Sequence, residues 1–199
     1  MNKALLEWIS VSGRLLGSLF YYAPNDERVK AVFSIFSEPN WEQQWPIQHS
    51  EIKSLIEQGQ TQNLSQDYQY LFIGPNDLPT PPWSSVYLDK ESVIFGESLL
   101  NLRTFLQKYQ IEFSQNTNEP EDHFGLMLML AAYLAEQKPD VLAEYLTEHL
   151  FTWAYRYLAL LSEQTDYPFY QGIALLAQDT LQYWQEQANL PVKTPQLYR

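Results

Sequence analysis

Apolar residues recur at three- and four-residue intervals along most of the chain, which is the pattern of helices that bury one face. Residues 1–20 show it first, and Pro24 is expected to end that helix because proline cannot continue the hydrogen-bond ladder. The same spacing predicts helices over 29–36, 52–56, 68–72, 99–109, 141–150, 152–164 and 168–188, with a short helical pattern around Phe95. No segment alternates polar and apolar residues as a half-buried strand does. The pattern therefore predicts an all-α fold: one domain over 1–199, a bundle of roughly eight or more helices without a sheet.

Another helix is predicted to begin at Asn118, whose side chain can cap free backbone amides. Glu121, three residues later, would complete a capping-box-like pair. Under this interpretation Asp122 and His123 lie partly exposed in the first helical turn and take no part in the cap. The buried stripe of this helix would consist of Phe124, Met127, Leu128, Ala131, Leu134 and Ala135.

Residues 73–90 interrupt the helical pattern with one glycine and four prolines. Because proline lacks an amide donor and clashes with the preceding turn, this segment is predicted to be a non-helical loop. Long loops in compact domains are usually functional or disordered. Trp83, Val86 and Tyr87 argue against disorder, so we expect this loop either to fill a gap in the core or to form part of a binding site.

Cysteine is absent from the sequence, which excludes disulfides, thiol catalysis and cysteine-ligated zinc. No apolar run reaches the roughly 18 residues that a membrane-spanning helix needs. Glu7, Ser10 and Arg14 interrupt the apolar pattern of the first 20 residues, unlike the continuous apolar core of a secretory signal. We therefore expect a core helix there and a cytoplasmic protein.

The chain is acidic, with 24 Asp and Glu against 12 Lys and Arg and a formal net charge of −12. Nucleic acid is therefore excluded as a partner, because phosphate binding requires a basic surface. A basic partner would be attracted and steered by this charge. The same charge is also explained if it only keeps the protein in solution.

Motifs for catalysis are few. The sequence has neither a Gly-x-Ser-x-Gly elbow nor a phosphate-binding glycine loop. Asp122 and His123 could share a divalent ion or do acid–base work, but neighbouring helical residues point about 100° apart and no second ligand pair follows. We expect no catalytic residue, no metal and no cofactor, and keep an Asp/His metal-dependent hydrolase as the minor alternative.

The proline-rich loop and the acidic segment after it belong to a longer series of motifs. These are Gly13-Arg14-Leu15-Leu16-Gly17, Tyr68-x-x-Leu71-Phe72, Gly74-Pro75, Pro81-Pro82-Trp83-x-Ser85-Val86-Tyr87-Leu88-Asp89 and Asn118-Glu119-Pro120-Glu121-Asp122-His123-Phe124-Gly125. In these motifs the sequence resembles the TorD/DmsD family of redox-enzyme maturation chaperones, and the DmsD branch in particular. The resemblance covers essentially the whole chain, except that Asn76 stands where relatives can carry tryptophan.

The resemblance implies a cytoplasmic, all-helical chaperone that is not an enzyme. It would bind the twin-arginine signal peptide of a molybdoenzyme's catalytic subunit, dimethyl-sulfoxide reductase for this branch, and delay export until cofactor insertion and folding are complete. Other partners that it raises are the export machinery and guanine nucleotide, the latter as an alternative regulatory function in the same pathway. It leaves open a monomer or a swapped dimer. The candidate signal-peptide-binding residues are Phe72, Trp83, Tyr87, Glu119, Asp122 and His123.

Overall fold

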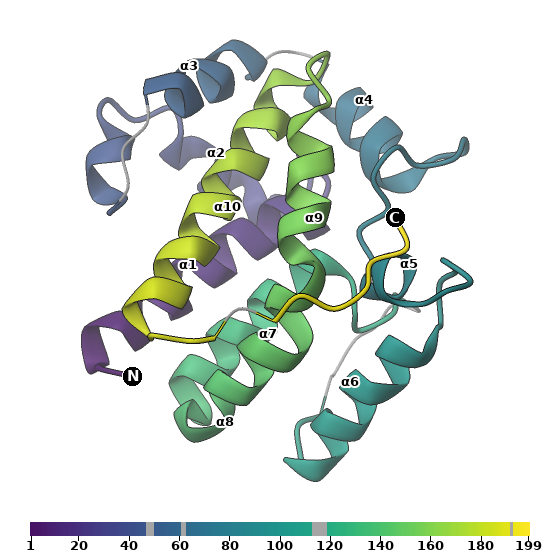
Figure 1. The fold of residues 1–199 in the computed structure, drawn as a ribbon. Helices are drawn as coiled ribbons and strands as arrows, with labels where there is room; N and C mark the ends of the chain where they lie inside the picture. The colour runs from purple at the N-terminus through teal and green to yellow at the C-terminus, as the bar shows by residue number, and fades with distance from the viewer. Residues whose placement is uncertain (47–49, 61–62, 113–118, 192) are drawn as a thin grey trace.

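A computed structural model describes residues 1–46, 50–60, 63–112, 119–191 and 193–199, and these residues form helices and connecting segments without a strand (Figure 1). The predicted all-α fold is therefore confirmed for the described part of the chain. Short 3-10 turns occupy Glu27–Val29 and Trp41–Gln44, and π-helical turns extend α4 over Gln69–Ile73 and α8 over Leu146–Leu150. The α-helices are α1 (Lys3–Tyr21), α2 (Lys30–Ile35), α3 (Ser50–Gly59), α4 (Leu64–Tyr68), α5 (Ser84–Leu88), α6 (Glu97–Lys108), α7 (Phe124–Gln137), α8 (Pro139–Tyr145), α9 (Phe151–Ser162) and α10 (Pro168–Gln187).

Two predictions for residues 73–95 differ from the structure. Helix α5 lies inside the segment that was expected to be wholly non-helical, because its last proline, Pro82, precedes the helix and leaves its turns intact. The helical pattern around Phe95 does not form a helix. Phe95 instead has a left-handed backbone with φ 72° and an exposed ring, and α6 begins two residues later.

Helices α1 and α7 make the most extensive helix–helix contact of the fold, and glycines allow it. A Cβ atom at Gly17 would lie 2.6 Å from the carbonyl oxygen of Gly125, and one at Gly125 would lie 2.7 Å from that of Gly17. Both distances are shorter than van der Waals contact. The glycines therefore let the end of α1 approach the start of α7 backbone to backbone.

Helices α9 and α10 form an antiparallel pair at the centre of the molecule, with α3 packed along α10 (Figure 1). Both helices bury large aromatic residues, including Trp153, Tyr157 and Trp184. Burial of such side chains is the main favourable term in folding a helical bundle. Among the described helices, none has both the length and the apolar composition needed to cross a lipid bilayer.

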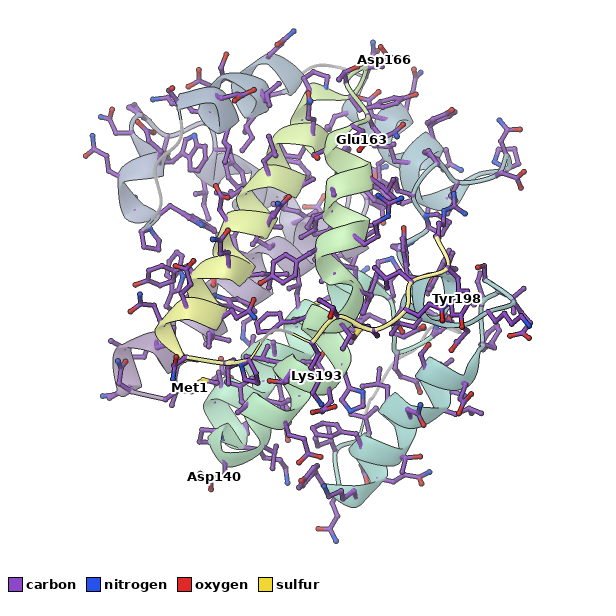
Figure 2. The ribbon with its side chains drawn as sticks, in the orientation of Figure 1. Met1, Asp140, Glu163, Asp166, Lys193 and Tyr198 are labelled. Carbon is purple, nitrogen blue, oxygen red and sulfur yellow. The ribbon has the colours of Figure 1, made fainter. Side chains whose placement is uncertain are left out.

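The segment after α10 runs back across the molecule toward α5 (Figure 1), and Figure 2 shows Lys193 and Tyr198 along it. The backbone amide of Tyr198 donates to the carbonyl oxygen of Tyr87 at 2.9 Å. The Arg199 guanidinium donates to the carbonyl oxygen of Pro79, also at 2.9 Å. These bonds attach the tail to the proline-rich loop from outside.

Candidate functional site

Helix α7 begins at Phe124 with His123 as its N-cap, five residues after the cap predicted at Asn118. The Nδ1 atom of His123 accepts a hydrogen bond from the backbone amide of Gly125 at 3.1 Å. The predicted capping box is wrong in its second member, because Glu121 forms an ion pair with Arg103 of α6 at 2.8 Å. Asn118 lies outside the described residues.

Asp122 and His123 are buried, with 0% and 4% of their surfaces exposed, so the expected partial exposure of this pair is wrong. Asp122 Oδ2 accepts hydrogen bonds from the backbone amide of Ser85 at 3.0 Å and from its hydroxyl at 2.9 Å. It also accepts one from the Ser84 hydroxyl at 3.0 Å. Since Ser84 and Ser85 open α5, the carboxylate of Asp122 caps that helix from a different segment.

A single antiparallel bridge joins Trp83 to His123 and holds the proline-rich loop against the start of α7. The Phe124 amide donates to the Pro82 carbonyl at 2.7 Å, and the Ser84 amide donates to the Asp122 carbonyl at 3.2 Å. The Trp83 and His123 rings meet edge to face with their centres 6.0 Å apart. Segments about 40 positions apart in the chain are thereby brought together.

Trp83 and His123 face a groove of about 690 Å³, which we call the aromatic groove. Its described walls come from the end of α1 and the turn after it, from α4 and its π-helical extension, from the proline-rich loop, and from α7 with the segment before it. Most of the lining side chains are aromatic or aliphatic. The lining residues are Tyr21, Tyr22, Ala23, Asp26, Arg28, Tyr68, Phe72, Ile73, Trp83, Ile111, Glu112, Glu119, His123, Leu126, Met129, Leu130 and Tyr133.

Four of the six candidate residues line this groove and two do not. Phe72, Trp83, Glu119 and His123 are in its wall, whereas Tyr87 and Asp122 have no exposed surface. Tyr87 stacks on Trp153 with ring centres 5.4 Å apart, in the core behind the loop. The structure therefore places Tyr87 and Asp122 where they support the wall of the groove.

Sequence motifs assigned no site role to Tyr22, Asp26, Arg28 or Met129, which also line the groove. The aromatic pair Tyr21-Tyr22 directly follows the first predicted helix, so it offered a signal. The groove is built from segments distant in sequence, and helical periodicity carries no information about which segments meet.

Glu119 carries the carboxylate that interacts directly with the tryptophan of the groove. Its Oε1 atom accepts a hydrogen bond from the indole Nε1 of Trp83 at 2.6 Å. Among the described residues Glu119 has no cationic partner. Burial raises the pKa of its carboxyl, an effect that the Trp83 hydrogen bond partly offsets.

Burial lowers the pKa of His123 to about 3, because the buried imidazole is more stable in its neutral form. His123 is therefore neutral at physiological pH, as its role as an acceptor at Nδ1 requires. It contributes a ring to the groove and no positive charge. The negative groups of the groove are not neutralised by this histidine.

Within the described residues, no group of three or more histidine or carboxylate side chains is arranged to hold a metal ion. Asp122 Oδ2 and His123 Nδ1 are each occupied in capping a helix. The groove has carboxylates, aromatic faces and apolar side chains. Such an arrangement suits a ligand that carries guanidinium groups next to an apolar segment.

Comparison with known proteins points to one family. The family model described as nitrate reductase delta subunit matches residues 38–159. The chain is 55% identical over 199 residues, with 98% of each sequence covered, to the probable Tat proofreading chaperone DmsD of Haemophilus influenzae. It is 40% identical over 194 residues to the Tat proofreading chaperone DmsD of Salmonella typhi, covering 96% of this chain and 95% of that protein.

A solved structure shares the fold. It is that of a redox enzyme maturation protein from Archaeoglobus fulgidus, which aligns with a TM-score of 0.54 over 86% of this chain and 91% of the other at 18% identity. At this identity the likeness concerns the fold alone, and it agrees with the helical architecture of Figure 1.

Proposed function

Because this chain belongs to the nitrate reductase delta subunit family, which includes the TorD and DmsD chaperones of redox-enzyme maturation, we propose that it binds the twin-arginine signal peptide of a redox enzyme in its aromatic groove. The client is a molybdoenzyme catalytic subunit, and the DmsD relatives favour dimethyl-sulfoxide reductase. The protein acts in the cytoplasm, before export.

The observation that carries this proposal is the Glu119–Trp83 pair in the groove wall. A guanidinium group binds a carboxylate through two parallel hydrogen bonds and stacks on an aromatic face. Glu119 is half-buried and without a cationic partner among the described residues, and the Trp83 hydrogen bond fixes its orientation. A leader arginine would supply the missing positive charge.

Apolar contact alone does not explain selectivity for such a leader. Burying about 400 Å² of apolar surface would contribute on the order of 10 kcal/mol. Association and ordering of a flexible peptide cost roughly 4–15 kcal/mol. The net apolar term is therefore small and is similar for any signal peptide, so the carboxylates must select the arginine pair. While the leader occupies the groove, it is withheld from export, which gives the client time for cofactor insertion and folding.

The test is calorimetric titration with a synthetic twin-arginine leader. We expect binding that weakens by at least tenfold when both arginines are replaced by glutamine, because two charge-assisted contacts are lost. Binding to the natural leader should also weaken with added salt, since screening reduces the attraction between the −12 chain and a basic peptide. Glu119→Gln should reduce the difference between the two peptides, with the exposed Glu7→Gln as the matched control.

Equal affinity for the arginine and glutamine leaders would contradict the proposal and leave the net charge as a solubility device. Native mass spectrometry of the purified protein tests for a nucleotide-binding regulator and for an Asp/His hydrolase in one measurement. A retained guanine nucleotide would favour the regulator, and a retained divalent metal would favour the hydrolase.

A further inference from the structure

Arg28 is the only lysine or arginine among the described residues that line the aromatic groove. Its Nε donates to Asp26 Oδ1 at 2.9 Å and its Nη2 donates to Asp26 Oδ2 at 2.5 Å. The carbon of the guanidinium lies 4.0 Å from the centre of the Tyr22 ring. A forked carboxylate contact combined with an aromatic face is how proteins bind a ligand arginine.

We propose that Asp26 and Tyr22 form a guanidinium subsite of the groove, which Arg28 fills in the free protein and yields to an arginine of the bound leader. The ligand is a peptide guanidinium. This inference rests on the proposed function, and it adds a second arginine position to the one at Glu119 and Trp83. Two subsites in one groove match a leader with two arginines.

Arg28 is weakly held, which is what an exchangeable occupant requires. Its side chain is 64% exposed, and its ion-pair partner belongs to the same turn of the chain. Exposed ion pairs of this kind contribute little to stability, because water and salt screen the attraction. Exchanging one guanidinium for another preserves the fork and the aromatic contact, so the exchange costs little.

Asp26 stays in place whichever guanidinium occupies the subsite. Its Oδ1 atom also accepts a hydrogen bond from the backbone amide of Arg28 at 2.9 Å, as the cap of the 3-10 turn Glu27–Val29. That bond does not depend on the Arg28 side chain. The Asp26 side chain is 26% exposed and lines the groove, and the bond from the Arg28 amide holds its carboxylate there.

Because Arg28 fills the subsite in the free protein, the subsite should prefer arginine over lysine at this position of the leader. A leader arginine replaces the fork of Arg28 with an equivalent fork. A lysine ammonium offers a point charge without the planar fork, so it must displace a better ligand than itself. A leader residue therefore has to bind the subsite at least as strongly as Arg28 does.

The experiment measures leader affinity by calorimetry for the wild type, Arg28→Gln, Arg28→Lys and Lys30→Gln. We expect Arg28→Gln to bind about fivefold tighter, because the leader arginine no longer has to displace a weak, exposed ion pair. Arg28→Lys keeps the charge but loses the fork, and should fall between the wild type and Arg28→Gln. Lys30 is paired with Glu27 outside the groove, so Lys30→Gln removes the same charge and should change affinity less than twofold.

A second pair of variants tests the role of Asp26. Asp26→Asn retains the Oδ1 acceptor that caps the turn and loses the carboxylate. It should weaken leader binding more in the Arg28→Gln background than in the wild type, because only there is the subsite free beforehand. Equal gains in Arg28→Gln and Lys30→Gln, with Arg28→Lys unchanged, would show general charge repulsion and overturn the inference.

The two proposals can fail separately. If the wild type binds the leader and discriminates against glutamine while no Arg28 variant differs from it, the subsite is wrong and the function stands. If the wild type does not bind the leader, the function fails, and acetyl-arginine amide then tests the subsite alone by NMR. Shifts of the Tyr22 ring signals in Arg28→Gln that vanish on adding Asp26→Asn would support the subsite, and their absence in Arg28→Gln would overturn it.

Discussion

Asp122, buried behind the groove, and His123, in its wall, both act on backbone. Asp122 caps α5 and His123 caps α7, so each holds in place a segment that other residues use to face the groove. The sequence identified both residues as important, but a helix start at Asn118 made them look free for binding. The correct assignment depends on Ser84 and Ser85, which lie almost 40 positions away and reach Asp122 only in the folded chain.

Replacing Asp122 should therefore cost stability, which is the opposite of what a free binding residue would do. Asp122→Ala leaves the Ser85 amide and two serine hydroxyls without their acceptor in a buried site, at a cost of about 1–3 kcal/mol. Urea unfolding measures this cost. Asp140→Ala is the matched control, because Asp140 is exposed at the edge of the molecule (Figure 2) and should change stability by less than about 0.5 kcal/mol. An unchanged urea midpoint for Asp122→Ala would refute the capping role.

His123 predicts a specific dependence of stability on pH. Its pKa is about 3 in the folded protein against an ordinary value of 6.5, so the unfolded chain takes up the proton first on acidification. The contribution of His123 is fully present above pH 6.5 and is lost progressively as the pH falls toward 3. His123→Asn keeps a cap acceptor without a titrating group. The urea stability of the wild type should fall relative to this variant over that pH window. Parallel pH curves for the two proteins would rule out a buried neutral histidine.

Pairs of helices determine how the walls of the groove meet. The contact of α1 with α7 brings Tyr21 to within 5.4 Å of His123 between ring centres, and it depends on Gly17 and Gly125. The periodicity of each helix was visible in the sequence, and so was the pair Gly13 and Gly17 within α1. The sequence did not show which helix packs against α1, because a glycine indicates that another segment approaches closely without identifying that segment.

Gly17→Ala tests this contact. Alanine normally stabilises a helix interior by up to about 1 kcal/mol relative to glycine. Here the added Cβ would lie 2.6 Å from the Gly125 carbonyl oxygen, and we expect a net destabilisation of about 1–3 kcal/mol together with weaker leader binding. Val11→Ala, at an exposed position of the same helix, should leave both unchanged. A Gly17→Ala variant as stable as the wild type would show that α1 and α7 can separate without cost.

Over the whole molecule, the sequence was most informative about fold class and least about the groove. Helical spacing and the absence of alternating polar and apolar segments were enough for the all-α architecture, because each helix shows its own buried face. The groove gathers Tyr22, Phe72, Trp83 and Met129 from four separate segments, and the acidic balance of the chain indicated only the sign of its ligand. From the length and the helical pattern of the chain, we expect residues 1–199 to unfold as one cooperative domain.

The positions of the tryptophans in the fold determine what intrinsic fluorescence can report about the groove. Of the six indoles in the chain, Trp83 is the one that lines the groove; Trp41, Trp45, Trp153 and Trp184 are in the core, and Trp8 is partly buried against Trp45 and is not part of the groove lining. A leader bound in the groove would replace water at the half-buried Trp83 ring, whereas the buried indoles already lack contact with water. We therefore expect intrinsic fluorescence to change on leader binding without a label, and Trp83→Phe to remove most of that change.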